Sequence, residues 1–209
     1  MKEYKLLNRV LPGKENKQKR EILRHAADCF HEYGIAATSI EMIKEKSKFS
    51  VGSIYHHFKN KESIIAQLVL ASVEDLYNYR QLYLLDAKNF EECIYALVLS
   101  YLDWVEDHPH FAYLMLSEKL EVHAGEYCEI LEEKRAFSRQ RIVDWLLLPE
   151  NKAGLNDEVP HDLYSSFING IPEHYCKYWF LERVKGNPRM YKKQIALAVW
   201  SVFKGFRME

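Results

Sequence analysis

The run Phe49-Ser50-Val51-Gly52-Ser53-Ile54-Tyr55-His56-His57-Phe58 decides how the first part of this chain folds. Ser50 is a typical helix N-cap residue, and the apolar residues Ile54 and Phe58 follow at helical spacing. The run therefore predicts a short helix that begins after Ser50 and ends near Phe58. We expect Ile54 and Phe58 to face the core of a small helical domain.

Two more helices are predicted before this run. From Lys17 onward, apolar residues recur every three or four positions, and Gly34 then supplies a left-handed helix stop. Thr38 or Ser39 caps a short helix, and a four-residue turn over 46–49 joins that helix to the next. Three short helices within about 42 residues have the proportions of a helix-turn-helix, whose last helix enters the DNA major groove.

The rest of the chain is also predicted to be helical. A long helix is expected from Asn60 to about Leu85, shared between the N-terminal unit and the remainder. Further helices are expected over 89–108, 111–120, 125–148, 160–184 and 188–206, with a kink or a break at Pro172. No strand alternation persists, and only 8 Gly and 6 Pro occur in 209 residues. The predicted fold is therefore all-α, with about nine helices.

Charge is divided unevenly along the chain. The total of 29 Lys and Arg against 30 Asp and Glu gives a net charge of −1, which by itself argues against a nucleic-acid partner. Residues 1–61, however, carry 13 basic and 7 acidic residues, a net of +6, whereas residues 62–209 carry 16 and 23, a net of −7. A basic head joined to an acidic remainder is typical of a DNA-binding protein.

The head resembles the N-terminal domain of the tetracycline-repressor (TetR/AcrR) family of bacterial transcription regulators. The resemblance covers residues 17–65 and rests on Ala37-Thr38-Ser39-Ile40, Ile43, the run from Phe49 to Phe58, and Lys61-Glu62. It implies a C-terminal domain that binds ligands and dimerises. We therefore expect a flexible basic arm over 1–16, a helix-turn-helix DNA-binding domain over 17–62, and a ligand-binding and dimerisation domain over 63–209.

Four turn residues depart from the family pattern. Lys44, Ser47, Lys48 and Phe49 stand where Ala, Ala, Gly and Val are usual. Lys48 in place of the turn glycine costs about 1 kcal/mol if that position is left-handed. The lysines also add positive charge on the side expected to meet DNA, so we interpret these changes as variation rather than as loss of function.

The expected DNA contacts gather at the second and third short helices. Gly52 lets the backbone approach DNA closely, while Val51 and Ser53 are placed to meet base edges. Tyr55 and His56 resemble the phosphate-contacting pair of the family. The expected set is Thr38, Ser39, Ser50, Val51, Gly52, Ser53, Tyr55, His56 and Lys61. The open alternatives are that Thr38, Ser39 and Ser50 serve only as helix caps and that Tyr55 belongs to the core.

The C-terminal part is rich in aromatic residues and Met, which suits an apolar chamber with a few polar groups. The candidate ligand-binding residues are Tyr101, Trp104, His108, Phe111, Met115, His123, Tyr127, Trp145, Phe167 and His174. Each also suits an ordinary core position. The last two long helices are the expected dimer face, with apolar surface from Trp179, Phe180, Ile195, Val199, Trp200 and Phe203.

No catalytic residue, cofactor or metal site is predicted. GxSxG, P-loop, HExxH and GxGxxG patterns are absent, and the histidine spacings do not resemble a tight ligand set. The four cysteines, Cys29, Cys93, Cys128 and Cys176, form no CxxC pair and are expected to be buried thiols in a reducing cytoplasm. Neither a transmembrane helix nor a secretory signal is expected.

The leading hypothesis is a cytoplasmic, homodimeric repressor of the TetR type. A small, largely apolar ligand would release it from a near-palindromic double-stranded operator. One alternative is a helical small-molecule-binding or enzymatic protein with a non-functional DNA head, which Lys48 and Phe49 motivate. Another is a DNA-binding regulator that senses no ligand.

Overall fold

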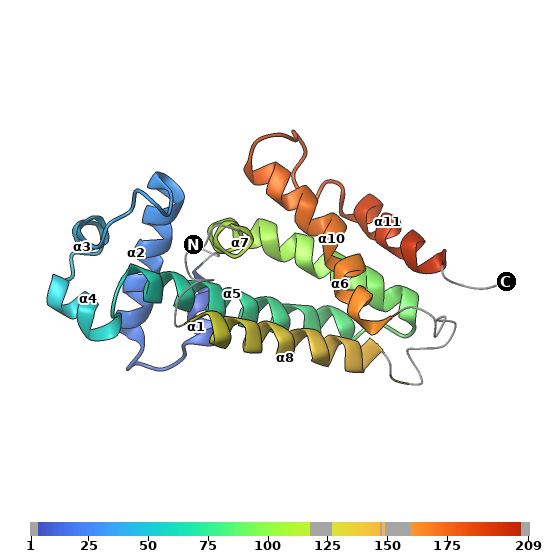
Figure 1. Ribbon diagram of the computed structural model, residues 1–209, viewed down its shortest axis with the longest axis horizontal. Helices are drawn as coiled ribbons and strands as arrows, with labels where there is room; N and C mark the ends of the chain where they lie inside the picture. The colour runs from blue at the N-terminus through green and yellow to red at the C-terminus, as the bar shows by residue number, and fades with distance from the viewer. Residues whose placement is uncertain (1–3, 118–126, 147, 149–159, 206–209) are drawn as a thin grey trace. The chain divides into compact units, whose positions relative to one another are not determined.

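The computed structural model describes residues 4–117, 127–146, 148 and 160–205 of the chain. Over these residues the fold consists of ten helices without a strand (Figure 1), which confirms the all-α prediction. The helices divide into two compact units, Met1–Asp75 with His108–Lys134, and Leu76–Asp107 with Arg135–Glu209. None of the helices described is long and apolar enough to span a membrane.

The first unit holds the predicted helix-turn-helix. It contains α1 (Lys5–Val10), α2 (Lys17–Tyr33), α3 (Ile40–Ser47), α4 (Val51–His57), the first part of α5 (Lys61–Leu84), and α7 (Pro109–Leu116). Helix α2 packs against α1, α3 and α7, and α3 packs against α4. Ile54 and Phe58 are buried as predicted, together with Phe30 from α2 and Ile43 from α3.

Helix α1 was not expected from the sequence. Its residues Leu6 and Leu7 are buried, so this part of the chain packs against the first unit rather than forming a loose arm. Arg9 of α1 holds Asp75 of α5 with two bonds, Nε to Oδ1 at 2.7 Å and Nη2 to Oδ2 at 2.8 Å. Six residues with two adjacent leucines give no repeat that a periodicity analysis could detect.

The second unit is built around α6 (Phe90–Asp107). Helices α10 (His161–Phe180) and α11 (Lys192–Lys204) pack against α6 and against each other, and parts of α5 and α8 (Cys128–Leu146) belong to the same unit. Phe203 of α11 lies edge-on to Phe90 and Tyr164, with ring centroids 5.4 and 5.7 Å apart. Pro172 lies inside α10, which continues through it as one helix.

The segment between α10 and α11 is fixed to α6 by charged groups. Asp103 of α6 accepts hydrogen bonds from Arg189 Nε at 2.9 Å, Lys192 Nζ at 2.7 Å and the Tyr83 hydroxyl at 2.9 Å. Burial by itself raises the pKa of Asp103, but the hydrogen bonds from Lys192, Arg189 and Tyr83 outweigh burial and lower the pKa. The ionised carboxylate therefore stabilises the second unit.

The side chains predicted for the dimer face have another role in four cases. Ile195, Val199, Trp200 and Phe203 are buried within the chain itself, on the side of α11 that meets α6. Trp179 and Phe180 are only partly exposed. The apolar stripe of α11 serves the core of its own unit, and a helical repeat alone does not reveal whether the covering surface belongs to the same chain.

The cysteines are free thiols, as expected. Cys29, Cys93 and Cys176 are buried as predicted, whereas Cys128 is partly exposed, so the prediction of burial is wrong for that residue. Burial raises the pKa of the Cys93 thiol to about 12, so this group stays protonated and acts as a small apolar side chain.

Candidate nucleic-acid interface

Serine hydroxyls fix the starts of both short helices. Ser39 caps α3 by accepting the Met42 amide hydrogen at 3.3 Å, and Ser50 caps α4 by accepting the Ser53 amide hydrogen at 3.1 Å. Both serines are exposed. Because each hydroxyl accepts in its capping bond, it keeps its own hydrogen for donation to another group. Capping and a contact to a phosphate are therefore compatible at both positions.

The turn between these helices passes through a left-handed residue. Lys48 has φ 59° and ψ 17°, and its amide bonds the Lys44 carbonyl at 2.8 Å to end α3. Lys48 occupies the position where the family that the head resembles usually has glycine, and the sequence predicts a cost of lysine there if the position is left-handed. The turn is therefore formed without glycine, and Lys48 remains exposed beside the start of α4.

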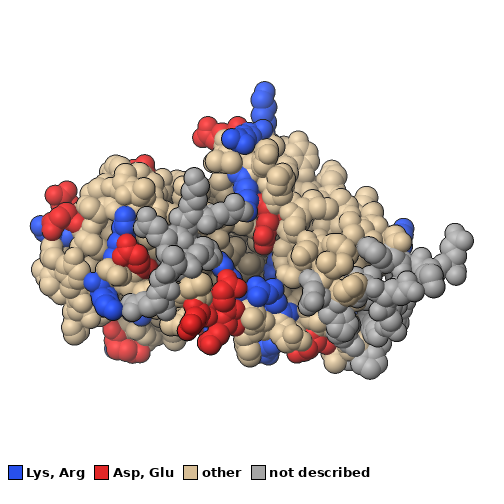
Figure 2. Space-filling view, in the orientation of Figure 1, with Lys and Arg blue, Asp and Glu red and all other residues tan. Residues whose placement is uncertain are grey.

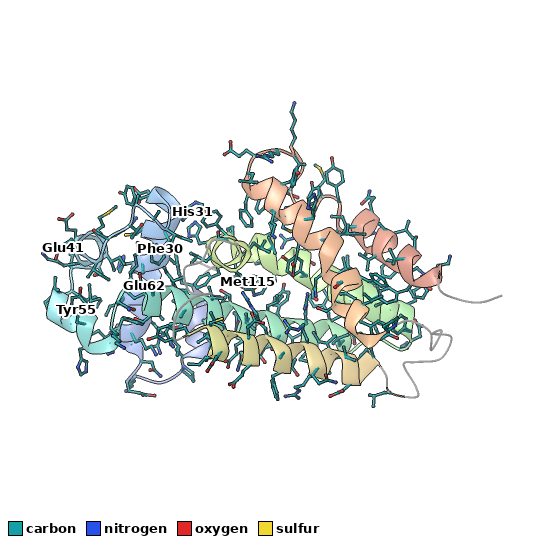
Figure 3. All side chains as sticks on the ribbon, in the orientation of Figure 1. Phe30, His31, Glu41, Tyr55, Glu62 and Met115 are labelled. Carbon is teal, nitrogen blue, oxygen red and sulfur yellow. The ribbon has the colours of Figure 1, made fainter. Side chains whose placement is uncertain are left out.

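Helix α4 presents one side to the core and the other to solvent. Ile54 is fully buried, whereas Tyr55 is 52% exposed and His56 is also exposed. Figure 3 shows Tyr55 on the outer side of α4, away from Phe30 on α2. This exposure excludes the alternative that Tyr55 is a core residue, and it leaves the hydroxyl accessible to a partner.

Gly52 gives the solvent side of α4 a flat surface near its start. A Cβ atom added there would meet only the Ser50 hydroxyl oxygen, at 4.0 Å. The glycine is therefore not required by packing within the chain. Val51 and Ser53 flank it and are partly exposed. A backbone bare of side-chain bulk at this point can approach another surface closely.

Gln18, at the start of α2, holds α4 in place and was missed by the sequence analysis. Its side-chain amide donates to the Ser53 hydroxyl, and its Oε1 lies 3.2 Å from His57 Nε2. Burial, with the nearby charges of His56 and Lys19, lowers the pKa of His57. The neutral ring then donates through Nε2, because the amide oxygen can only accept. A lone glutamine in a polar first turn carries no periodic signal.

Two predicted contact residues are used inside the head. Thr38 is 2% exposed, and its hydroxyl lies within hydrogen-bond distance of the Cys29 and Gly34 carbonyls at 3.1 and 2.8 Å. This burial corrects the expected phosphate contact of Thr38, since the hydroxyl is enclosed and satisfied. Lys61 donates to the Ile35 carbonyl at 3.2 Å, but it is partly exposed and carries further ammonium hydrogens.

The lysines of the head differ in how they are paired. Lys46 lies 2.5 Å from Glu32, and Lys44 lies 2.9 Å from Glu41. Lys48 forms no ion pair with any of the residues that the structure describes. Figure 2 shows basic (blue) and acidic (red) side chains interspersed over the face of the head in view. The positive charge available to a partner therefore comes from individual lysines without an ion pair, such as Lys48, and not from one broad basic surface.

The candidate ligand-binding residues divide between the two units. His108, Phe111, Met115 and Tyr127 belong to the first unit; Tyr101, Trp104, Trp145, Phe167 and His174 belong to the second; and His123 lies outside the described residues. His108 is buried, and its Nε2 is 3.8 Å from Asp75 Oδ2. It therefore joins the Arg9–Asp75 pair, while Phe111 beside it is fully buried.

Within the second unit the candidates lie in different surroundings. Tyr101 and Trp104 are buried on α6, and Phe167 lies edge-on to Phe203 with centroids 5.7 Å apart. His174 is exposed and lies beside Tyr178, so it faces outward rather than into an interior site. Over the residues described, no three His, Cys, Asp or Glu side chains group as metal ligands would.

Comparisons with known proteins identify the head. Residues 22–68 match the sequence model of the bacterial regulatory proteins of the tetR family. The chain is 25% identical over 157 residues to the HTH-type transcriptional repressor KstR2 of Mycobacterium tuberculosis H37Rv, covering 75% of this chain and 78% of that protein. It is 35% identical over 66 residues to KstR2 of Rhodococcus jostii RHA1, covering 31% and 32%.

Solved structures share the fold across most of the chain. The ketosteroid transcriptional regulator KstR2 of Mycobacterium tuberculosis has a TM-score of 0.70 at 21% identity, covering 93% of this chain and 97% of that one. The regulator FadR of Bacillus subtilis, solved in complex with stearoyl-CoA, has a TM-score of 0.73 at 14% identity, covering 87% and 97%.

Proposed function

Because the chain belongs to the tetR family of bacterial regulatory proteins, we propose that it is a homodimeric repressor released from a near-palindromic operator by a small, largely apolar ligand. The observation that carries the proposal is the two-sided α4, with Ile54 buried and Tyr55 exposed on a helix whose start is capped by Ser50. Residues 17–62 would bind DNA, and residues 63–209 would bind the ligand and dimerise.

The proposed DNA contacts follow from the chemistry of the exposed groups. Val51 can contact a thymine methyl group, and Ser53 can bond a base edge, while Gly52 lets the backbone come close. Phosphates would be bound by polar and basic groups around them. That set is Ser39, Ser50, Tyr55, His56 and Lys61, with the exposed Lys48 as a further cation.

Fluorescence anisotropy with DNA from the gene's own promoter region tests this interface. Tyr55→Phe and Lys61→Ala should each weaken binding by about tenfold, as expected for loss of a hydrogen bond to a charged phosphate. The matched control is Tyr33→Phe, because Tyr33 is an exposed tyrosine on α2, outside the proposed face. Equal affinities for the wild type and the Tyr55→Phe and Lys61→Ala variants would contradict the assignment.

The proposed dimer face is the outward side of α10 and α11, both in the second unit. The exposed residues of α10 recur at helical steps without a charge: Leu163, Ser166, Gly170, Ile171, His174 and Tyr178. Those of α11 between Lys193 and Lys204 are also uncharged: Gln194, Leu197, Ala198 and Ser201. In Figure 2 the surface over α11 is largely tan. Two such helices from each subunit can form a four-helix bundle.

Analytical ultracentrifugation tests this face. Gly170→Arg and Leu197→Glu should convert a dimer into a monomer, because each places an unpaired charge where two apolar surfaces meet. Leu82→Glu is the matched control: Leu82 is 62% exposed on α5 and outside this face. A monomeric wild type, or dimeric Gly170→Arg and Leu197→Glu variants, would refute the proposed face.

A largely apolar effector is supported by two lines of observation. Aromatic and aliphatic side chains make up most of the interior of the second unit, including Phe90, Tyr164 and Trp200. The similar structures include a ketosteroid regulator and a regulator bound to stearoyl-CoA. Because the proposed partner is DNA, the proposed location of the protein is the cytoplasm. An effector should lower the affinity for promoter DNA, since it must bind the released state more tightly.

A further inference from the structure

A polar cluster lies in the second unit, formed by the buried Arg80 on α5 and Tyr101 on α6 and by the half-buried Asn169 and Glu173 on α10. Arg80 is 8% exposed, and its Nη2 donates to Asn169 Oδ1 at 2.7 Å. Its Nε has no hydrogen-bond partner among the described residues, nor has the hydroxyl of Tyr101, which is 1% exposed. The Arg80 Cζ lies 5.5 Å from the centroid of the Tyr101 ring, so the two unsatisfied groups belong to side chains in contact with each other.

The Arg80 guanidinium in this cluster has no ion pair among the described residues. No carboxylate of the described residues lies within 4.0 Å of the Arg80 guanidinium. Glu173 is the acidic group whose charge acts on both Arg80 and Tyr101. Burial raises the pKa of Glu173, against weaker opposing effects of Arg80, Lys177 and Arg135, so its negative charge is disfavoured there. The buried guanidinium therefore has no carboxylate bonded to it among the described residues.

Burying the Arg80 Nε and the Tyr101 hydroxyl without acceptors lowers the stability of the fold unless a bound partner supplies the acceptors. A buried guanidinium Nε and a buried hydroxyl without acceptors each destabilise the fold, whereas an oxyanion accepts from both and neutralises the charge. Two donors, an arginine Nε and a phenolic hydroxyl, suit the two oxygens of a carboxylate. The residues one helical turn away from Arg80 and Tyr101 include four that are buried and mostly aliphatic, Leu76, Leu84, Leu97 and Trp104, and Ile168 next to Asn169 is buried too.

We propose that Arg80 and Tyr101 bind the carboxylate of an organic acid whose apolar body packs among the neighbouring buried side chains. This inference rests on the proposed effector function and specifies the chemical class of the effector. The carboxylate accepts from Arg80 Nε and from the Tyr101 hydroxyl, and Asn169 orients the guanidinium through its bond to Nη2. Arg80 is then a binding residue, and Asn169 a positioning residue.

The test uses the full-length protein without DNA, with decanoate as the probe and methyl decanoate and decanoyl-CoA as its uncharged and thioester counterparts. Isothermal titration calorimetry should show decanoate binding, and at least a tenfold weaker affinity for methyl decanoate and decanoyl-CoA. Arg80→Met and Tyr101→Phe should each weaken decanoate binding at least tenfold, equivalent to about 1.4 kcal/mol. Tyr95→Phe, on the same helix, is the matched control and should bind as the wild type does.

A second readout separates binding from a structural role. If the two groups await a ligand, Arg80→Met and Tyr101→Phe should leave the melting temperature of the unliganded protein unchanged or raise it, because each removes an unsatisfied buried group. They should also abolish the increase in melting temperature that decanoate produces in the wild type. A lower melting temperature with unchanged decanoate affinity would mean that Arg80 and Tyr101 only support the fold, and would overturn the proposal.

The remaining outcomes are equally decisive. A preference for the methyl ester or the CoA thioester, or no decanoate binding at about 1 mM, overturns the carboxylate assignment. The proposed repressor function is judged separately, by promoter binding. Decanoate binding that depends on Arg80 but leaves DNA affinity unchanged would support this site and contradict release by the effector. Release of DNA by an uncharged apolar compound would support release by an effector and contradict the carboxylate site.

Discussion

Replacing Lys48 by glycine should stabilise the head and at the same time weaken its binding to DNA. Lys48 has φ 59°, in the left-handed region that a side chain with a Cβ atom enters at a cost. It ends α3 and is separated from the first residue of α4 by Phe49 and the N-cap Ser50. The same residue is exposed and free of ion pairs within the described part of the chain, so its charge can meet a phosphate.

The magnitude follows from two opposing effects of glycine. A residue with a Cβ atom pays about 1–2 kcal/mol in this conformation. Glycine removes that cost but loses about 0.5–1 kcal/mol through the greater freedom of the unfolded chain. The net gain in the free energy of unfolding is therefore about 0.5–1 kcal/mol. With a urea dependence of about 2–3 kcal/mol per molar, the unfolding midpoint should rise by about 0.3 M.

Lys48→Ala is the matched control, because alanine removes the charge but keeps the Cβ atom. Urea unfolding should place Lys48→Ala near the wild type and Lys48→Gly above both, at the same protein concentration. Both variants should lose promoter affinity alike and reduce the salt slope by about 1 for each subunit. If Lys48→Gly is no more stable than Lys48→Ala, the account of this turn is wrong.

Three other changes test the packing on which the proposed interface and the second unit depend. Gly34→Ala should lower the free energy of unfolding in urea by about 1–3 kcal/mol, because Gly34 has φ 81° and ψ 158°, a conformation that alanine rarely adopts. The added methyl group would meet no atom within 4 Å, so the loss would come from the backbone conformation and not from a clash. Ile54→Ala should cost about 2–5 kcal/mol, because Ile54 is fully buried, and a smaller change would place it outside the core. Asp103→Asn should cost about 2 kcal/mol at neutral pH, since it weakens the bonds from Lys192 and Arg189. That difference should be present above about pH 4 and disappear as the pH falls through the lowered pKa of Asp103; a difference independent of pH would show that the charge is not responsible.

The sequence predicts best where the physical cause is local. Ser50 caps the helix that it was expected to cap, and Ser39 caps the helix for which Ser39 and Thr38 were the two candidates. Both caps could be predicted because an N-cap bond spans only three residues. Ile54 and Phe58 are buried because their spacing of four places them on one side of a helix turn. Lys48 takes the left-handed conformation at a turn position where the family that the head resembles usually has glycine.

Other features depend on which surface covers a residue, and a repeat does not contain that information. The stripe with Val199 and Phe203 was expected at a dimer face, but it faces α6. Thr38 was expected at DNA, but its hydroxyl is enclosed under the Cys29 carbonyl. Arg80 did carry a signal, since it lies four residues from both Leu76 and Leu84 on a buried stripe. That its Nε lacks a partner can be seen only in three dimensions.

The most direct test of the central claim is the salt dependence of binding to the gene's own promoter DNA, measured beside a scrambled sequence of equal length. Lys48 and Lys61 of two subunits provide four cations, which predicts a log–log slope of about −4 for the affinity against salt concentration. The promoter should also bind at least 10³-fold more tightly than the scrambled DNA. A slope near zero, or equal affinity for both sequences at every salt concentration, would contradict the assignment of α4 as a DNA-reading helix.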